Sequence, residues 1–421
     1  MARLAIIGGG ASGLMTAHRL QNEHDVTVFE KEAQIGGNVR TLNANVFVDR
    51  GPKDLRLECG VLGFHQHSSP VLHALLGDLN IDLSASQPST SIYHNGHYFP
   101  ARAANLCNRS VLLHWLRHPS YASKMARLKR DYAAGFQAIS RYVGQEDPDL
   151  GTLLGLNPIL DDFIRSLLAL AFSTPFSETD RLPVSLIAPY FRSLRQPDWS
   201  YVRSGVASYL MKIVGKGRFE LITDAGEVRL DRTHHGVRIH AKGQTMTADA
   251  VVLATTPGQV LNIVTDADEL ERNWFKDWSD RHFTTILHSD EAIYHPYKRT
   301  PRTPMDLFVN HQSSAFGYNT SLSEFCGLPE HARYGFAYGL DNDISTDAVI
   351  YRCQHTVPVY TAAALRTRKD LIANMGRRGL FFAGAWLDNG LHEGAAVSAK
   401  RTAQCVLSNN IGQQGPLAAA V

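Results

Sequence analysis

The amino-acid sequence predicts an α/β fold in which a parallel sheet, assembled from distant parts of the chain, is interleaved with a second, α+β unit. Three observations support this prediction. A short apolar run near the amino terminus leads into a glycine-rich turn, a second run follows about 20 residues later, and apolar and glycine residues combine again near residue 380. Short apolar runs bounded by glycine are typical of strands buried on both faces of a parallel sheet.

Composition sets the first limits on function. The 421 residues exceed what one compact core usually holds, and 44% hydrophobic and 19% charged residues are ordinary for globular proteins. A formal net charge of +2 provides no broad field toward nucleic acid or an anionic membrane. No apolar run reaches the roughly 18 residues of a transmembrane segment. Five scattered cysteines without paired spacing favour a reducing, cytoplasmic location.

The amino-terminal segment carries the clearest motif. Residues 4–7 predict a buried strand, and residues 8–13 then have the pattern Gly-x-Gly-x-x-Gly. Apolar residues between 14 and 20 recur at helical spacing, so a helix begins within the glycine run. Residues 26–29 predict a second strand, which ends at Glu30. This order of strand, glycine turn, helix, strand and acid is the fingerprint of a Rossmann-type dinucleotide-binding unit.

Each glycine of this turn has a physical role. Gly8 permits the tight turn, Gly10 has no Cβ and lets a pyrophosphate approach the backbone, and Gly13 lets the helix pack closely on the strand. The first helical residues, Ala11 and Ser12, present N–H groups and the positive end of the helix dipole to the phosphates. We therefore predict a cofactor site at this turn.

Glu30 limits which nucleotide fits. Its carboxylate can accept hydrogen bonds from both ribose hydroxyls and would repel a 2′-phosphate, which argues against NADP. Lys31 follows directly, and a paired glycine, Gly36-Gly37, comes shortly afterwards. An NAD site does not need that paired glycine.

The paired glycine, followed by Thr41, resembles the Gly-Gly-Arg turn of the flavin amine oxidase superfamily, which includes amine oxidases, protoporphyrinogen oxidases and phytoene desaturases. The resemblance implies that FAD is the cofactor and that this loop contacts it. Asn38 stands where the family usually has arginine, and Arg40 is the candidate for the missing cation.

The resemblance returns near the other end of the chain. Residues 379–386 are similar to the last FAD strand and turn of that family, except that Ala385 replaces an acid, and residues 390–401 are similar to the segment that opens its final helix. In the family, the helix amino terminus points at the flavin pyrimidine edge, where it stabilises negative charge. The cofactor-binding residues implied here are Gly384, Ala385, Trp386, His392, Glu393 and Ala395.

A third similar segment lies in the middle. A hairpin is predicted over residues 235–246, and residues 248–257 resemble the central strand of the family, which ends in an Ala-Thr turn beside FAD. The resemblance places Ala254 and Thr255 at that turn and the backbone of Val228 against the adenine. Three further stretches, 58–64, 288–290 and 355–360, resemble a bacterial branch of flavoproteins often associated with cyclopropane fatty acid synthases, a branch without a well-defined common reaction.

The order of these segments predicts a discontinuous FAD-binding domain and an inserted substrate domain. Helical spacing over residues 110–170 predicts helices, either in the core or on a lipid-facing surface, and mixed charges disfavour the latter. The FAD-binding domain is expected at 1–85, 205–265 and 370–412, the substrate domain at 86–204 and 266–369, and a flexible tail at 413–421.

The resemblance implies an FAD-dependent oxidase, desaturase or dehydrogenase of the amine oxidase type. It would remove hydride from a C–H bond of an apolar small molecule or an amine, and oxygen or another acceptor would reoxidise the flavin. Two alternatives remain open: a redox-neutral double-bond isomerase of a fatty acid or polyene, and a non-catalytic dinucleotide-binding module. No second dinucleotide fingerprint appears, so an NADPH site is not expected. The sequence leaves the oligomeric state open.

No catalytic residue and no metal site can be assigned. Lys298 is the one candidate for a lysine beside the flavin, although its surroundings are typical of a surface loop. His65 and His67 are two residues apart, but no third ligand has a matching spacing. Tyr338, Tyr351 and Tyr360 are candidates for lining a cavity.

Overall fold

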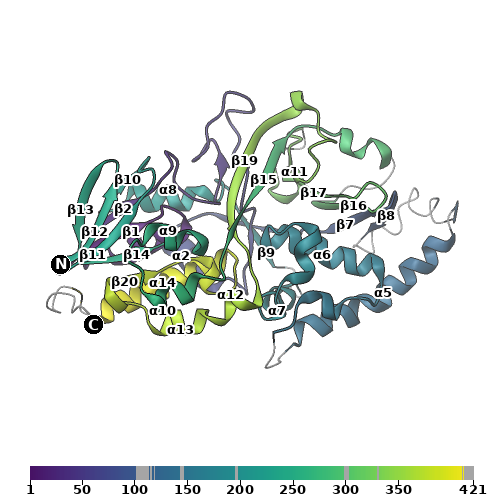
Figure 1. Ribbon diagram of the computed structural model, residues 1–421. Coiled ribbons are helices and arrows are strands. Elements are labelled where there is room, and N and C mark those ends of the chain that lie inside the picture. Colours follow the sequence, from purple (N-terminus) through teal and green to yellow (C-terminus); the bar gives the residue numbers. More distant parts are fainter. Residues whose placement is uncertain are drawn as a thin grey trace.

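The structure is a computed structural model that describes residues 1–100, 113, 116–117, 119–142, 147–194, 198–297, 303–329, 331–409 and 411. Figure 1 shows a parallel sheet with its helices at one end of the molecule and a second sheet with long helices at the other. The predicted tail at 413–421 and Lys298 lie outside the described residues. No helix in the described ranges is long and apolar enough to span a bilayer.

The parallel sheet is assembled from distant segments, as predicted. Its five strands have the order β10-β2-β1-β14-β20, and every neighbouring pair is parallel. Helix α1 (Ala11–Leu20) follows the first strand, and α14 (His392–Ser408) follows the last and packs against α1. The strands are β1 (Arg3–Ile7), β2 (Asp25–Phe29), β10 (Glu220–Ile222), β14 (Ala250–Leu253) and β20 (Leu380–Phe382).

The expected hairpin is part of a small antiparallel sheet. This sheet consists of β11 (Arg229–Thr233), β12 (Gly236–Ala241) and β13 (Gln244–Ala248). Leu230, Val237 and Ile239 are buried, so one face of the hairpin belongs to the core. The hairpin thus leads the chain directly into β14 of the parallel sheet.

The second large sheet has seven strands in the order β19-β15-β18-β17-β16-β7-β8. All neighbouring pairs are antiparallel except β16 and β7. The strands are β7 (Thr90–His94), β8 (His97–Pro100), β15 (Asp280–His288), β16 (Met305–Asn310), β17 (Ala315–Ser321), β18 (Gly335–Tyr338) and β19 (Val349–Pro358).

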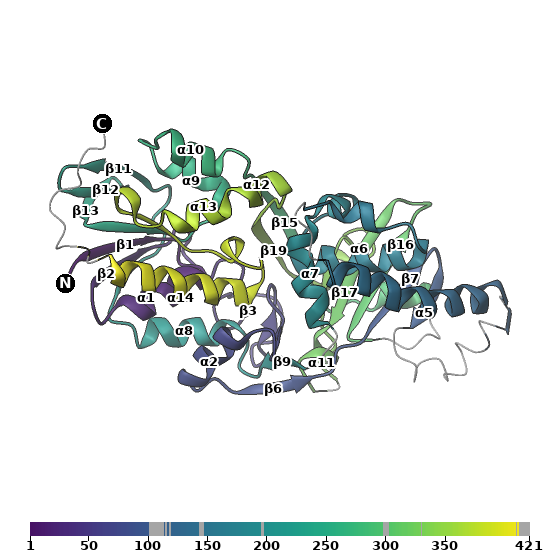
Figure 2. The same cartoon turned by 90° about the horizontal axis from the view of Figure 1, so that it is seen from below.

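Three helices accompany this sheet, as Figure 2 shows: α5 (Pro119–Ser140), α6 (Pro158–Phe172) and α7 (Val184–Ser193). The Asn157 side chain caps α6 by accepting from two backbone N–H groups, and a proline at its first position has no N–H to satisfy. Helix α6 is largely buried, whereas most described side chains of residues 119–134 in α5 are exposed. The prediction that these helices lie in the core is therefore confirmed for α6 and wrong for the first half of α5.

Short elements connect the two large sheets. The chain folds into two small sheets and several helices of four to nine residues between them. These elements are β3 (Thr41–Leu42), β4 (Leu57–Glu58), β5 (Phe64–His65), β6 (Leu83–Ser86), β9 (Trp199–Val202), α2 (Pro70–Asp78), α8 (Ala207–Gly215), α9 (Val260–Ile263), α10 (Glu269–Phe275), α11 (Leu322–Phe325), α12 (Ala362–Arg366) and α13 (Arg368–Ala373).

Candidate functional site

A cavity of about 1580 Å³ lies between the carboxyl ends of the parallel strands and the seven-stranded sheet. Ligands of open α/β sheets bind at this edge. The volume exceeds the roughly 300–1,000 Å³ of ordinary small-molecule pockets. The predicted cofactor residues that line the cavity are Gly8, Gly10, Ala11, Ser12, Glu30, Lys31, Gly36, Gly37, Asn38, Arg40, Val228, Ala254, Thr255, Gly384, Ala385, Trp386, His392, Glu393 and Ala395.

Gly8 and Gly13 hold the glycine turn together. Gly8 has a φ of +115°, which L side chains rarely adopt. A Cβ on Gly13 would lie 1.9 Å from the Gly8 carbonyl oxygen. Gly13 does not line the cavity, so the described geometry gives it the predicted packing role between helix and strand.

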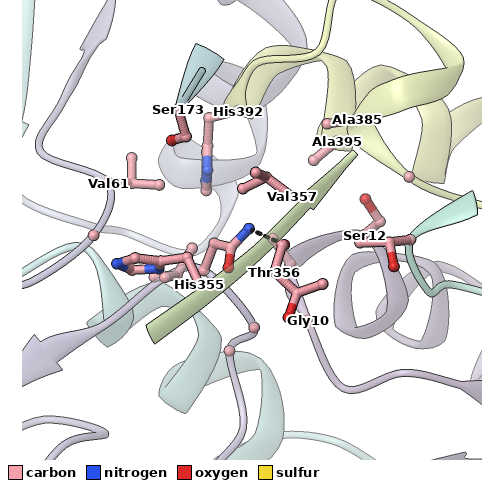
Figure 3. A pocket seen from close by; sticks show the side chains of 18 of the residues that line it. Gly10, Ser12, Val61, Ser173, His355, Thr356, Val357, Ala385, His392 and Ala395 are labelled. Atoms are coloured by element: carbon pink, nitrogen blue, oxygen red, sulfur yellow. Dashed lines mark hydrogen bonds between the residues drawn. The ribbon is translucent and has the colours of Figure 1, made fainter. Parts of the chain in front are cut away.

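Gly10 differs, because the space beside it is open. A Cβ on Gly10 would meet nothing closer than the Gly37 Cα atom, at 3.8 Å. The paired glycine lies against this turn, and the Gly36 N–H donates to the Gly9 carbonyl oxygen at 2.9 Å. Two glycine segments thus form one cradle at the amino terminus of α1 (Figure 3, where Gly10 and Ser12 are labelled). This cradle fits a pyrophosphate.

Glu30 is fixed at the end of β2. Its carboxylate accepts hydrogen bonds from the Gly9 N–H at 2.8 Å and the Glu32 N–H at 3.0 Å. The side chain is 7% exposed and lines the cavity next to Lys31. The predicted ribose acid therefore stands beside the cradle.

Thr255 carries a buried hydroxyl that has no hydrogen-bond partner among the residues that the structure describes. A buried unpaired hydroxyl costs about 1–3 kcal/mol, so a polar ligand group in the cavity would relieve it. Trp386 lies beside Thr255 and donates its indole N–H to the Thr255 carbonyl oxygen at 3.2 Å. The open cradle and this orphaned hydroxyl both fit a dinucleotide.

The amino terminus of α14 enters the cavity from the other side (Figure 3). The His392 Nε2 atom shares a hydrogen bond of 3.0 Å with the Tyr209 hydroxyl. Its ring stacks on Phe64 at 6.0 Å, and burial lowers the pKa of His392 to about 4, so the imidazole is neutral at pH 7. The Glu393 carboxylate accepts from the N–H groups of Val71 and Leu72, both at 2.9 Å, at the start of α2.

Asn38, at the position of the usual arginine, connects the two parts of the molecule. Its side-chain amide donates to the Thr356 carbonyl oxygen of β19 at 3.1 Å. Arg40 lines the cavity and donates to the Ile35 carbonyl oxygen at 3.3 Å. Arg40, the candidate for the missing cation, therefore lies at the cavity, and its contact with a cofactor stays a prediction.

Thr41 lies outside the cavity and serves the surrounding structure. Its hydroxyl donates to the Glu58 carboxylate at 2.7 Å, and the Val206 N–H donates to the other oxygen of that carboxylate at 2.8 Å. Glu58 is 3% exposed, and burial raises the pKa of its carboxyl group to about 8. Glu58 is thus protonated at neutral pH and joins Thr41, which follows the paired glycine, to the start of α8.

This raised pKa predicts a pH effect on stability. The unfolded carboxyl group titrates near 4.5, so the folded state binds the extra proton between pH 4.5 and about 8 and loses stability as the pH rises through this range. The slope from one such group is about 1.4 kcal/mol per pH unit. In Glu58→Gln this slope disappears. Urea unfolding of both proteins at pH 5 and pH 8 measures it, and a stability difference that is equal at both pH values would contradict the assignment.

The rest of the cavity wall combines apolar and aromatic side chains with polar ones such as Thr285 and Gln354. The Thr285 hydroxyl contacts the His355 Nε2 atom at 2.9 Å, and burial lowers the pKa of His355 to about 4. Tyr351 and Tyr360 line the cavity as anticipated, whereas Tyr338 does not and stacks on Phe283 at 4.1 Å. The apolar and aromatic lining residues include Val61, Leu62, Leu170, Phe172, Tyr190, Tyr318, Phe325, Phe336 and Val357.

Sequence reasoning missed much of this wall. The sequence connects the stretches 58–64 and 355–360 with a flavoprotein branch but not with the site, and it gives no sign that residues 170–173 and 189–193 belong to the site. Their apolar character is indistinguishable from core packing in the sequence. Lys31 is the one lysine among the described lining residues, and it lies at the Glu30 end.

Two histidine clusters occur, one of which includes the cavity-lining His65. His65 and His67 both contact Asp198. His94, Asp162 and His311 offer ligand atoms within 4.8 Å of one another, a grouping that sequence spacing did not reveal. Both imidazoles bond to the same oxygen of Asp162, and its other oxygen accepts from Arg165 at 3.1 Å. The hydrogen bonds to Asp162 and the opposite charges of Asp162 and Arg165 explain why these side chains lie together.

Residues 6–79 match the family model of an NAD(P)-binding Rossmann-like domain. No protein with a curated description matches the chain. Three solved structures are similar: cyclohexylamine oxidase from Brevibacterium oxydans IH-35A (TM-score 0.69, 13% identity), wild-type putrescine oxidase bound to putrescine (0.66, 13%) and a CLA-producing fatty acid isomerase from P. acnes (0.66, 15%). Each comparison covers 97% of this chain and 99% of the other. The predicted fold class is confirmed.

Proposed function

We propose that this chain, which has the fold of the flavin amine oxidase superfamily, is an FAD-dependent oxidoreductase acting on an apolar small molecule. One observation carries the proposal. The glycine cradle at α1 and the aromatic wall around β19 open into the same cavity. A dinucleotide in the cradle would therefore reach the space that holds the substrate.

Some residues of the chain would bind the cofactor, and others would shield the reaction space from water. When bound, FAD would accept a hydride from a C–H bond of the substrate. The amino terminus of α14 directs its positive dipole end into the cavity, next to the neutral imidazole of His392. The aromatic wall, which includes Phe172, Tyr190 and Tyr360, excludes water and orients an apolar substrate.

The charges along the cavity support an uncharged substrate over a protonated amine. Among the described lining residues, the carboxylates are Glu30, Glu32, Glu227 and Glu393. The first two lie at the end of β2, and Glu227 adjoins the predicted adenine contact at Val228. Glu393 has both oxygens bonded to α2. No described carboxylate is therefore left over to pair with an ammonium group on the substrate side.

The experiment is anaerobic spectroscopy of the purified protein. We expect a yellow protein whose released cofactor has the mass of FAD. A polyene or fatty acid should bleach the flavin without oxygen, and air should restore the colour with release of hydrogen peroxide or after addition of another acceptor. A panel of amines is the matched comparison. A colourless, folded protein that rejects excess FAD would exclude the proposed function, and bleaching by amines alone would exclude an uncharged substrate.

A redox-neutral double-bond isomerase is the second candidate. The apolar wall suits a fatty acid or polyene, and the similar fatty acid isomerase has the same fold. Anaerobic turnover separates the two candidates. An oxidase stops after one equivalent of substrate with its flavin bleached, whereas an isomerase continues to form product with its flavin oxidised.

A further inference from the structure

The helix α5 begins in the most basic stretch of the chain. Between residues 101 and 130 there is no aspartate or glutamate, so the net charge of +2 for the whole chain conceals this local cluster. Five leucines and one tryptophan lie among the cations in the same stretch. The cations are Arg102, Arg109, Arg117, Lys124, Arg127, Lys129 and Arg130.

Most of the described side chains of this stretch are exposed, and Leu128 is half-buried. We call Leu113, Leu116, Arg117 and residues 119–134 the basic arm. Leu116 is 78% exposed and Leu113, three residues before it, is 39% exposed, so two apolar side chains near each other in the sequence lie at the surface. Lys124, Arg127 and Arg130 follow at intervals of three, so they share one side of α5, and all three are exposed. Figure 2 shows this half of α5 extending away from the parallel sheet.

The basic arm is joined to the cavity wall through aromatic rings. Tyr132, 42% exposed, stacks on Phe136 at 4.2 Å, and Phe136 meets Phe191 of α7 edge to face at 4.9 Å. The neighbouring Tyr190 lines the cavity and contacts Phe172 at 5.9 Å. A surface bound to the arm would therefore lie beside the helices that enclose the substrate space.

We propose that the basic arm docks on the surface of a bilayer that contains anionic phospholipids. Exposed cations next to exposed leucines match the two parts of such a surface, because the head groups attract the cations and the interface accepts the apolar side chains. An RNA would be attracted by the cations but would leave the exposed leucines in water. If the proposed function holds, the apolar substrate reaches the cavity from this bilayer.

Vesicle flotation of the full-length protein tests the docking without any turnover assay. We expect binding to vesicles of phosphatidylcholine with phosphatidylglycerol, no binding to phosphatidylcholine alone, and loss of binding in about 1 M salt, where the Debye length falls to roughly 3 Å. The triple variant Lys124→Gln, Arg127→Gln, Arg130→Gln should partition on the order of 100-fold more weakly. Leu116→Ser should weaken binding at low salt as well.

The matched control removes three exposed lysines elsewhere. Lys276→Gln, Lys369→Gln and Lys400→Gln together change the net charge equally and should leave binding as it is in the unchanged protein. Circular dichroism of each variant verifies folding. Equal partitioning of both triple variants, or absence of binding to the anionic vesicles at low salt, would overturn the proposal. Displacement of the protein from vesicles into a complex with single-stranded RNA would do so in favour of a nucleic-acid surface.

Discussion

Gly10→Val will give a folded protein that does not retain FAD. The backbone at Gly10 has φ −76° and ψ −177°, which any residue adopts, and a Cβ there meets no protein atom closer than 3.8 Å. The valine side chain would instead fill the space of the pyrophosphate. We expect affinity for FAD to fall on the order of 100-fold, since overpacking at a close contact costs up to roughly 3 kcal/mol. Absorbance of the purified variant and titration with FAD measure the loss.

Gly13→Ala is the variant to compare with Gly10→Val, because it should disrupt folding instead of FAD binding alone. The new Cβ would lie 1.9 Å from the Gly8 carbonyl oxygen, so α1 must move away from β1. This variant should lose solubility or unfold at much lower urea concentration, with or without FAD. A Gly10→Val protein that purifies with a full complement of flavin would show that the pyrophosphate does not lie at this turn.

Glu393→Ala will destabilise the protein and weaken FAD binding together. Both oxygens of the buried Glu393 carboxylate accept from the first N–H groups of α2, across more than 300 positions of sequence. Removing it leaves the Val71 and Leu72 N–H groups without this acceptor, and the unpaired N–H of the buried Leu72 costs about 1–3 kcal/mol. Because Glu393 is in the first turn of α14, that helix end also loses its anchor beside the cavity.

Urea unfolding of the flavin-free protein measures the first effect, and FAD titration measures the second. Glu393→Gln keeps one acceptor oxygen. Its unfolding free energy and its FAD affinity should lie between those of the unchanged protein and those of Glu393→Ala. Glu23→Ala, which removes an exposed carboxylate, is the control and should change neither quantity. Unchanged unfolding of Glu393→Ala would mean that α2 does not depend on this carboxylate.

The parts of the site that the sequence predicted are those with a local backbone requirement. The glycine turn, Glu30 and the segment before α14 are recognisable because a phosphate or ribose needs particular residues within a few positions. The wall formed by Phe172, Tyr190 and His355 was not predictable, since an apolar residue facing a cavity has the same sequence pattern as one facing the core.

Two other features show where local patterns fail. Thr41 fits the family motif, yet its hydroxyl binds Glu58, because the motif carries no information about a buried partner 17 positions away. His94 and Asp162 meet across 68 positions, and His311 joins them from 149 positions beyond Asp162. Only the packing of α6 against the seven-stranded sheet brings these three side chains together. The division into domains stays a prediction.

The pairing of β14 with β20 has a consequence for the order in which the protein is made. A ribosome has translated the glycine turn and the aromatic wall around β19 before it reaches residues 380–395, several of which line the cavity. During synthesis the nascent polypeptide therefore holds only an open half-site. We expect the cofactor to be captured late, after release of these last segments, so that flavin incorporation reports completed translation.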